Sequence, residues 1–161
     1  MESNGNKARD VSLRKFCPQD LKTLLYIFRL NVPEYFEAGE ETDFRNYLQL
    51  NSDTYYTILS NGLIAGGAGY RINKEEETGS ITWIFLHPDY TGEGIGKYSA
   101  KFLLGILQNH ENVKFLRADT SQHGYKFFGS LGFSMVKKKK DFWGRGLDLY
   151  RMEMMNTEPN K

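Results

Sequence analysis

Cysteine is nearly absent from this chain of 161 residues, in which Cys17 is the only one. A single thiol forms no internal disulfide and builds no cysteine-based zinc site, so we expect a reducing compartment and no metal. Long apolar runs are also missing, because none approaches the roughly 18 residues that span a bilayer. Residues 1–7 are polar and lack the apolar core of a signal peptide. The sequence therefore predicts a cytoplasmic protein with no membrane partner.

An excess of charge of one sign is missing as well. The 21 lysine and arginine residues offset 20 aspartate and glutamate residues, which leaves a formal net charge of +1. This balance argues against broad electrostatic adhesion, so we expect no nucleic-acid partner. The basic run Lys137–Lys140 is typical of a solvated strand or hairpin. Contact of this run with a phosphate or an acidic partner is the alternative.

Aromatic residues and glycine are abundant in the chain. It has 11 Phe, 10 Tyr and 2 Trp, enough to build a real core in one domain. Glycine accounts for 16 residues, about 10% against roughly 7% in average usage. One cluster lies in Gly92–Gly96. A second, Gly66–Gly69, thins out a predicted strand, where other backbone or a ligand is expected to come close.

The apolar periodicity predicts alternating strands and helices along nearly the whole chain. In order we expect strand 11–16, helices 20–30 and 43–50, strands 55–59, 63–72 and 81–86, a helix to about 109, strand 113–118, helix 122–131, and strands 133–136 and 147–152 around a Lys- and Gly-rich turn. The continuous apolar run of strand 81–86 is typical of a strand that is buried on both faces. Strand–helix–strand crossovers imply a locally parallel pair. The fold class is α/β (α+β by some conventions): a mixed sheet of about six to seven strands with helices on both faces, in one domain over 11–154 between flexible tails 1–10 and 155–161.

The segment Gly92-Glu93-Gly94-Ile95-Gly96 joins the apolar strand to the following helix. Unpaired N–H groups and the dipole at a helix start favour an anion, and glycine lets several N–H groups converge. A Walker A loop does not fit, because Thr91 and Tyr98 stand where a glycine and a magnesium-binding hydroxyl belong. A dinucleotide loop does not fit either, because Lys97 occupies the place of its third glycine.

Two motifs resemble the GNAT N-acetyltransferase superfamily. Leu86–Lys97 is similar to its acetyl-CoA signature, a strand that ends in x-x-Pro, an aromatic residue, and Arg/Gln-x-x-Gly-x-Gly/Ala. Phe127–Phe133 is similar to its later helix, which carries an aromatic residue four positions before Gly-Phe. The order of elements agrees over about 11–154. The resemblance implies an N-acetyltransferase with acetyl-CoA as acyl-donor co-substrate and an amine-bearing acceptor.

The resemblance also implies which residues hold acetyl-CoA. The backbone of Ile84, Phe85 and Leu86 would pair with the pantetheine arm like an added strand. Backbone N–H groups would hold the pyrophosphate, from the residues Thr91, Gly92, Glu93, Gly94, Ile95, Gly96 and Lys97. Ser121 and Phe128 would lie near the pantetheine and the thioester. Thr91 replaces the long Arg/Gln side chain of the signature, and Phe128 stands where the family often has a tyrosine acid.

The chemistry requires an amine to lose its proton, since its pKa lies near ~10.4, and a thiolate with a pKa of roughly 8.5 to leave. His87 is the candidate base, although a His before Pro is also typical of an exposed strand end. Tyr125 is the candidate acid, or an aromatic that packs on the sheet. Ser121 is a further catalytic candidate, or with Asp119 it could instead cap the following helix. No glutamate lies in strand 81–86, so a water relay is a further alternative.

The acceptor is expected to contact two loops that combine acidic and aromatic residues, Glu34–Glu37 and Asp141–Arg145. Either loop could equally be surface packing. The sequence does not select among small polyamines, antibiotics, amino acids, peptide N-termini and protein lysines, and it allows a monomer or a homodimer. Two alternative functions stay open. One is a non-catalytic acyl-CoA-binding sensor on the same fold, and the other is a binding module that uses the lysine run.

Overall fold

The computed structural model describes residues 10–157. Residues 1–9 and 158–161, which hold most of the two predicted tails, lie outside the described residues. Backbone contacts continue past the predicted end of the domain, because the Asn156 N–H donates to the Lys114 carbonyl at 2.8 Å. In the part of the chain that is described, no helix is both long and apolar enough to cross a membrane.

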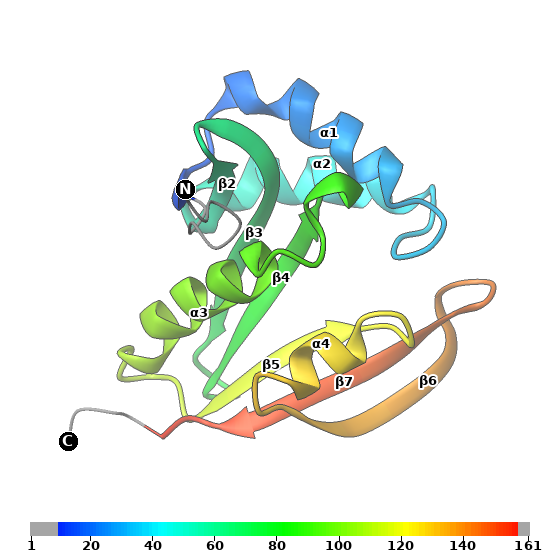
Figure 1. Cartoon of the computed structure of the whole chain (residues 1–161). Helices are drawn as coiled ribbons and strands as arrows, with labels where there is room; N and C mark the ends of the chain where they lie inside the picture. The colour runs from blue at the N-terminus through cyan, green and yellow to red at the C-terminus, as the bar shows by residue number, and fades with distance from the viewer. Residues whose placement is uncertain (1–9, 158–161) are drawn as a thin grey trace, which may run out of the picture.

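A seven-stranded mixed sheet organises the protein, with strand order β1-β2-β3-β4-β5-β7-β6 (Figure 1). The strands are β1 Val11–Lys15, β2 Tyr55–Ser60, β3 Leu63–Asn73, β4 Thr78–Leu86, β5 Phe115–Thr120, β6 Ser134–Gly144 and β7 Leu147–Met155. Among the strands of residues 10–157, only β4 and β5 pair in parallel, and the other neighbours are antiparallel. The predicted α/β class, strand number and parallel pair are therefore confirmed.

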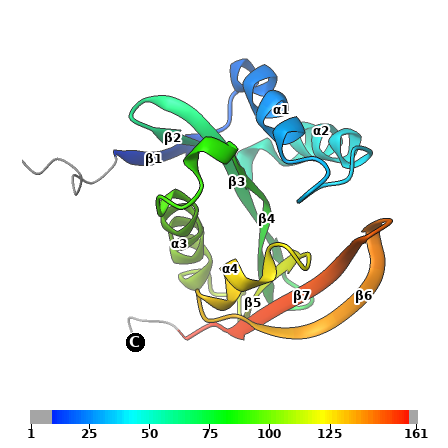
Figure 2. The ribbon, with the colours of Figure 1, turned by 45° about the vertical axis from the view of Figure 1, so that its right-hand side comes forward.

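Helices cover both faces of the sheet, as predicted (Figure 2). On one face lie α1 (Leu21–Leu30) and α2 (Glu40–Asn51), and on the other lie α3 (Ile95–Gln108) and α4 (Tyr125–Gly129). Short 3₁₀ turns, Pro18–Asp20, Ser52–Thr54 and Pro88–Tyr90, precede α1, β2 and the glycine loop. Each face has its own hydrophobic core. On one face α1 and α2 pack on Tyr55 and Phe85. On the other face α3 and α4 belong to a second core that contains neither of these two residues.

The C-terminal half differs from the predicted elements in length. The strand predicted over 133–136 extends to Gly144, so Lys137–Lys140 belongs to β6 and not to a turn. β6 is the edge strand of the sheet, and exposed lysines are common on edges because their charge opposes pairing with another chain. The helix predicted over 122–131 is reduced to Tyr125–Gly129.

Strand β4 departs most from the prediction, because it is not buried on both faces. Of the predicted run, only Ile81 and Phe85 are buried, while Thr82, Trp83, Ile84 and Leu86 are half-buried. The reason is the pairing: β4 contacts β5 only from Thr78 to Ile81. Beyond Ile81 the two strands diverge (Figure 1), and the second half of β4 has β3 on one edge and an opening on the other.

Candidate active site

A β-bulge distorts β4 at the point where the opening begins. The register against β3 shifts between Gly67 and Gly69, and Trp83 has a φ of 48°. Positive φ is a genuine outlier for a bulky residue, and such backbone strain clusters at functional sites. Thr82 and Trp83 consequently face the same side, since the Thr82 hydroxyl contacts the Tyr47 hydroxyl at 2.7 Å and Trp83 packs in the α1–α2 core.

The backbone of β4 presents alternate residues to the opening. The His87 N–H donates to the Ala65 carbonyl of β3 at 2.8 Å, and Phe85 pairs with Gly67 in the same register. Backbone groups alternate between the two edges of a strand, so Phe85 faces β3, while Ile84 and Leu86 face the opening. An extended amide ligand adds to such an edge as a further strand.

Asn31 at the end of α1 closes part of this edge. Its side-chain amide donates to the Leu86 carbonyl at 2.9 Å and to the Ile27 carbonyl at 3.0 Å. The Leu86 carbonyl is thereby bound within the protein, and the last turn of α1 is tied to the end of β4. Sequence reasoning missed Asn31, because nothing in the local pattern shows which distant carbonyl an asparagine reaches.

The glycine loop opens α3 in the expected manner. Gly92 and Gly94 have φ values of 80° and 82°, a conformation that costs L-residues with a Cβ roughly 1–2 kcal/mol. Gly94 is the N-cap of α3, and its carbonyl accepts the first helical bond from the Tyr98 N–H at 3.0 Å. The first-turn N–H groups, from Ile95 to Lys97, have no intrahelical acceptor at this end and can bind an anion.

Thr91 contributes differently from the other predicted loop residues. Its N–H donates to the Pro88 carbonyl at 3.2 Å, and its hydroxyl donates to the same oxygen at 2.8 Å. Both donors of Thr91 are therefore engaged within the Pro88–Tyr90 turn. The side chains of Thr91, Glu93 and Lys97 are exposed.

The start of α3, the end of β4 and α4 converge beside Gly96. A Cβ added to Gly96 would lie 3.4 Å from the Phe127 ring and 3.5 Å from the Leu86 side chain. The glycine loop and the β4–β5 opening are consequently neighbours, and Phe127 borders both. Phe128, the predicted contact, is only 4% exposed and packs against Phe127 and Phe133.

His87 occupies the strand-end position that was the alternative to a role as base. Its Nδ1 accepts a hydrogen bond from the Asp89 N–H at 3.0 Å and so caps the Pro88–Tyr90 turn. The imidazole lies near the rings of Tyr26 and Tyr90, at 6.4 and 5.9 Å. In its neutral form the ring proton must sit on Nε2, because Nδ1 acts as acceptor. A role as base stays a prediction.

Ser121 and Tyr125 form the turn that opens α4. The Ser121 hydroxyl accepts from the His123 N–H at 3.2 Å, and the Ser121 carbonyl accepts from the Tyr125 N–H at 3.0 Å. The Tyr125 ring packs on Tyr150, with centroids 4.9 Å apart. Asp119 has no capping role here, because Arg151 binds its carboxylate at 2.8 and 3.0 Å. The catalytic roles of Ser121 and Tyr125 stay predictions.

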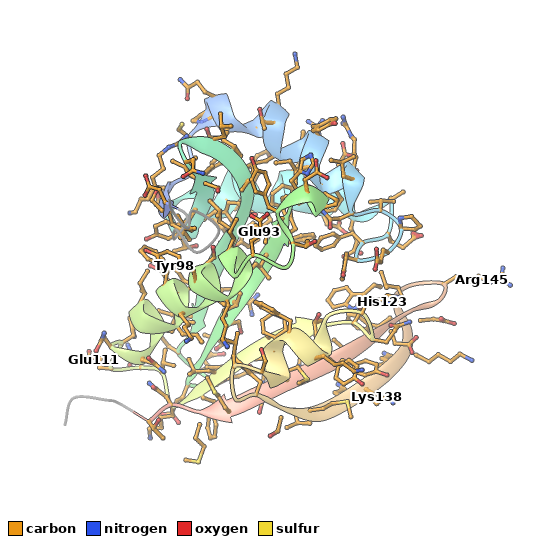
Figure 3. All side chains as sticks on the ribbon, in the orientation of Figure 1. Glu93, Tyr98, Glu111, His123, Lys138 and Arg145 are labelled. Atoms are coloured by element: carbon orange, nitrogen blue, oxygen red, sulfur yellow. The ribbon has the colours of Figure 1, made fainter. Side chains whose placement is uncertain are left out.

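The two predicted acceptor loops do come together, on the α1–α2 face. Tyr35 packs edge-on against His123 with centroids 6.3 Å apart, and Glu37 lies directly against Gly144. The Trp143 indole N–H donates to the Thr120 carbonyl at the end of β5, at 3.0 Å. In Figure 3 His123 lies below the loop that follows α1, and Arg145 projects from the tip of the β6–β7 hairpin.

Carboxylates crowd the α1–α2 side of this region. Glu40 is buried, and its carboxylate accepts from the Glu37 N–H at 2.8 Å. The pKa of Glu40 is raised to about 7, mainly by burial and also by the charges of Asp43 and Glu37, while the hydrogen bond from the Glu37 N–H opposes the rise. Burial, followed by the charge of Glu34, raises the pKa of Tyr35. Among residues 10–157, no group of three or more His, Cys, Asp or Glu side chains is arranged to hold a metal ion.

Several solved structures share this fold. Ard1 from Thermoplasma volcanium gives a TM-score of 0.77 at 14% identity, over 92% of this chain and 99% of that chain. The ribosomal-protein-S18-alanine N-acetyltransferase from Escherichia coli gives 0.72 at 19% identity, over 94% and 98%. Spermidine N-acetyltransferase from Vibrio cholerae, solved with CoA and spermine, gives 0.71 at 15% identity, over 92% and 96%. At these identities the likeness shows the fold alone.

Sequence comparison connects the fold to a family. No curated protein matches the sequence. The family model described as "Acetyltransferase (GNAT) family" matches residues 24–133, well over half of the chain. The match runs from α1 to Phe133, just before β6, and so includes the glycine loop, the β4–β5 opening and α4. The chain therefore belongs to the GNAT family of acetyltransferases.

Proposed function

We propose that this acetyltransferase transfers an acetyl group from acetyl-CoA to a primary amine by direct attack. The observation that carries the proposal is the opening between β4 and β5 beside the glycine loop. The opening offers the backbone of Ile84 and the Leu86 N–H to a pantetheine amide, and the first turn of α3 offers N–H groups to a pyrophosphate. One elongated ligand with both groups fits the two neighbouring features.

The reaction needs few protein groups. The neutral amine attacks the thioester carbonyl and forms the C–N bond, and the carbonyl electrons move to oxygen. The C–S bond then breaks, its electron pair leaves on the CoA sulfur, and the amine loses a proton to water or to a side chain. A thiolate with a pKa of roughly 8.5 departs without a strong acid, so Phe128 in place of a tyrosine is compatible with turnover.

The position of Cys17 favours direct transfer over a covalent acyl-enzyme. It is the only cysteine in the chain, and it lies in the turn before α1. There its sulfur is 3.5 Å from an Asp20 carboxylate oxygen and 3.6 Å from an Arg14 guanidinium nitrogen. A thiol in that place is not at the β4–β5 opening, so the chain holds no cysteine that could carry the acetyl group there.

The acceptor is a cationic amine that enters between the loop after α1 and the β6–β7 hairpin. Aromatic rings and carboxylates attract an ammonium group, and Tyr35, Glu37 and Trp143 supply both kinds at this side of the sheet. Burial between these loops would also favour the neutral amine that attacks, because desolvation disfavours the charged form.

A thiol-release assay with acetyl-CoA over several amine classes tests the function. The panel contains polyamines, amino acids, antibiotics with amino groups, peptides with a free N-terminus and proteins with accessible lysines. We expect release of CoA with at least one class, and acetyl-CoA binding in a calorimetric titration. Binding without release across the panel would favour the non-catalytic sensor, and no binding at millimolar acetyl-CoA would exclude both functions.

A Tyr125→Phe variant decides the role of that side chain. Unchanged turnover would show that its hydroxyl is not the acid and that the ring serves only to pack on Tyr150. A fall in kcat that becomes smaller at high pH would instead support the acid, because the hydroxyl must be protonated to donate and the wild-type protein loses this donor as well when the hydroxyl ionises.

A further inference from the structure

The glycines of β3 make room for one aromatic ring. Tyr55, the first residue of β2, is fully buried. A Cβ on Gly67 would lie 2.5 Å from the Tyr55 hydroxyl oxygen, and one on Gly69 would lie 2.7 Å from Cδ1 of the same ring. Both distances are shorter than any real Cβ contact, so the ring lies flat on the β3 backbone only because these two positions are glycine. Tyr55 thereby explains Gly67 and Gly69, whereas a Cβ on Gly66 would instead overlap the Phe85 carbonyl of β4.

The hydroxyl of this ring reaches the β4 bulge. It donates to the Trp83 carbonyl at 2.8 Å, at the residue with the strained φ of 48°. Burial raises the pKa of Tyr55 well above its usual value, so the hydroxyl keeps its proton and its role as donor at neutral pH. The neighbouring Tyr47 is different, because its hydroxyl contacts the Thr82 side chain and not the backbone.

The direction of the Trp83 carbonyl fixes the direction of the next N–H. The Trp83 C=O and the Ile84 N–H belong to one planar trans peptide and point in opposite directions. Because Tyr55 holds the carbonyl on the β2–β3 side, the Ile84 N–H points away from β3, toward the opening. A hydrogen bond to the carbonyl also polarises the peptide and strengthens its N–H as a donor.

We propose that Tyr55 is a positioning residue for acetyl transfer, which holds the β4 bulge so that the Ile84 N–H binds the thioester oxygen. The inference rests on the proposed function, because it needs acetyl-CoA in the β4–β5 opening. Preorganised N–H groups that meet a developing oxyanion contribute strongly to acyl transfer. Tyr55 contributes through the peptide that it orients and does not touch the substrate.

A Tyr55→Phe variant tests the proposal, with Tyr47→Phe as its matched control. Each variant keeps its ring and loses one hydroxyl in the same aromatic cluster. For Tyr55→Phe we expect kcat to fall at least about tenfold, since loss of an oxyanion donor costs about 10²–10³-fold and here the donor is only loosened. The KM for acetyl-CoA stays within about twofold, because ground-state binding uses other groups. Tyr47→Phe retains the wild-type kcat.

Two NMR measurements separate this inference from the proposed function. With [1-¹³C]acetyl-CoA, the carbonyl resonance shifts downfield on binding to the wild-type protein and less on binding to Tyr55→Phe. In the wild-type protein, addition of acetyl-CoA shifts the resonance of the Ile84 amide proton more than that of the Phe85 amide proton, which faces β3. This second measurement needs no variant, so it tests the proposal even if Tyr55→Phe does not fold.

The outcomes differ for the two proposals. Wild-type protein that binds no acetyl-CoA overturns both. Wild-type protein that binds acetyl-CoA with no greater shift at Ile84 than at Phe85 overturns the role of Tyr55 alone. The same holds when Tyr55→Phe equals Tyr47→Phe in kcat and in the carbonyl shift.

Discussion

Glu37 in the loop after α1 lies so close to Gly144 at the end of β6 that a Cβ on Gly144 would overlap its side chain. The contact joins two loops that are far apart in the sequence and closes one side of the proposed acceptor entrance. A Gly144→Ala substitution must push Glu37 away. We expect the KM for the acceptor to rise about tenfold, because one disturbed contact in a specificity pocket changes discrimination by about that factor. The Kd of acetyl-CoA should stay the same.

Gly105→Ala is the control for this substitution. Gly105 lies within α3 and has nothing within 4 Å of an added Cβ. Alanine there should stabilise the protein by roughly 0.5–1 kcal/mol, because glycine is unfavourable inside a helix. Both steady-state KM values should equal those of the wild-type protein. An unchanged acceptor KM in Gly144→Ala would show that the acceptor does not use this entrance.

The role of the glycine loop can be tested by comparing two glycines that have nearly the same backbone φ angle. Gly94 at the start of α3 and Gly62 in the β2–β3 turn have φ values of 82° and 84°, and both have open space around an added Cβ. Alanine at either position costs roughly 1–2 kcal/mol of stability. Only Gly94→Ala should weaken acetyl-CoA binding, by at least about tenfold, since a displaced N–H loses a hydrogen bond to a charged group.

Calorimetric titration with acetyl-CoA, together with thermal melts, checks this pair. Equal melting temperatures for the two variants would show that the strain is matched, so that a difference in Kd belongs to the loop. Equal Kd values would contradict the pyrophosphate site at α3.

Local pattern predicted the elements wherever periodicity was strong and the turn residues were specific. The predicted strands 55–59 and 63–72 and the helix that follows the glycine loop are examples, because Asn61, Gly62 and Gly94 take positive φ in the turns that precede them or join them. The pattern ended β6 too early, because the predicted strand stops at 136 although Lys137–Lys140 is typical of a solvated strand or hairpin. What makes this run a strand is its pairing with β7, a tertiary contact that charge composition does not contain.

The candidate site was predictable only as far as the motifs extend. The glycine loop and β4 were found, but the bulge at Trp83 was not, because the contact between the Tyr55 hydroxyl and the Trp83 carbonyl exists only in the fold. The glycines of the predicted strand 63–72 indicated that another group comes close to its backbone, but they did not indicate which residue this is. Asn31 was missed for the same reason, since its acceptor on Leu86 is brought near only by the fold.

Phe128 provides a test of what a hydroxyl would add at α4. It is buried among Phe127 and Phe133 at 4% exposure, and it stands where the family often has a tyrosine. Phe128→Tyr should raise kcat by up to about 10²-fold through protonation of the departing thiolate. The buried hydroxyl should also lower stability by about 1–3 kcal/mol.

Phe133→Tyr is the matched control, because Phe133 is equally buried in the same cluster. It should show the stability loss without the gain in kcat. Thiol-release kinetics and chemical denaturation of both variants measure the two effects. Equal kcat values would show that departure of the thiolate does not limit turnover or that position 128 does not face it.

Glu40 makes the stability of the α1–α2 region depend on pH. Burial raises its pKa to about 7 from a usual value of 4.5, so between these values the folded state binds more protons than the unfolded state. The free energy of unfolding then falls as pH rises through this window. Glutamine keeps an acceptor for the Glu37 N–H and does not titrate. Glu40→Gln should therefore gain stability relative to the wild-type protein between pH 5 and pH 8, by about 2 kcal/mol.

Glu41 provides a control of opposite sign at the adjacent position. Hydrogen bonds from Arg29, at 2.8 and 2.9 Å, lower its pKa, so its contribution is present above the usual carboxyl pKa and is lost as pH falls. Urea denaturation of both variants at several pH values measures how the free energy of unfolding of each changes with pH. Glu41→Gln should lose stability relative to the wild-type protein at pH 7 and regain the difference in acid, whereas Glu40→Gln gains most at high pH. If the free energy of unfolding of Glu40→Gln changed with pH in the same way as that of the wild-type protein, the Glu40 carboxyl would ionise in the folded state as readily as in water.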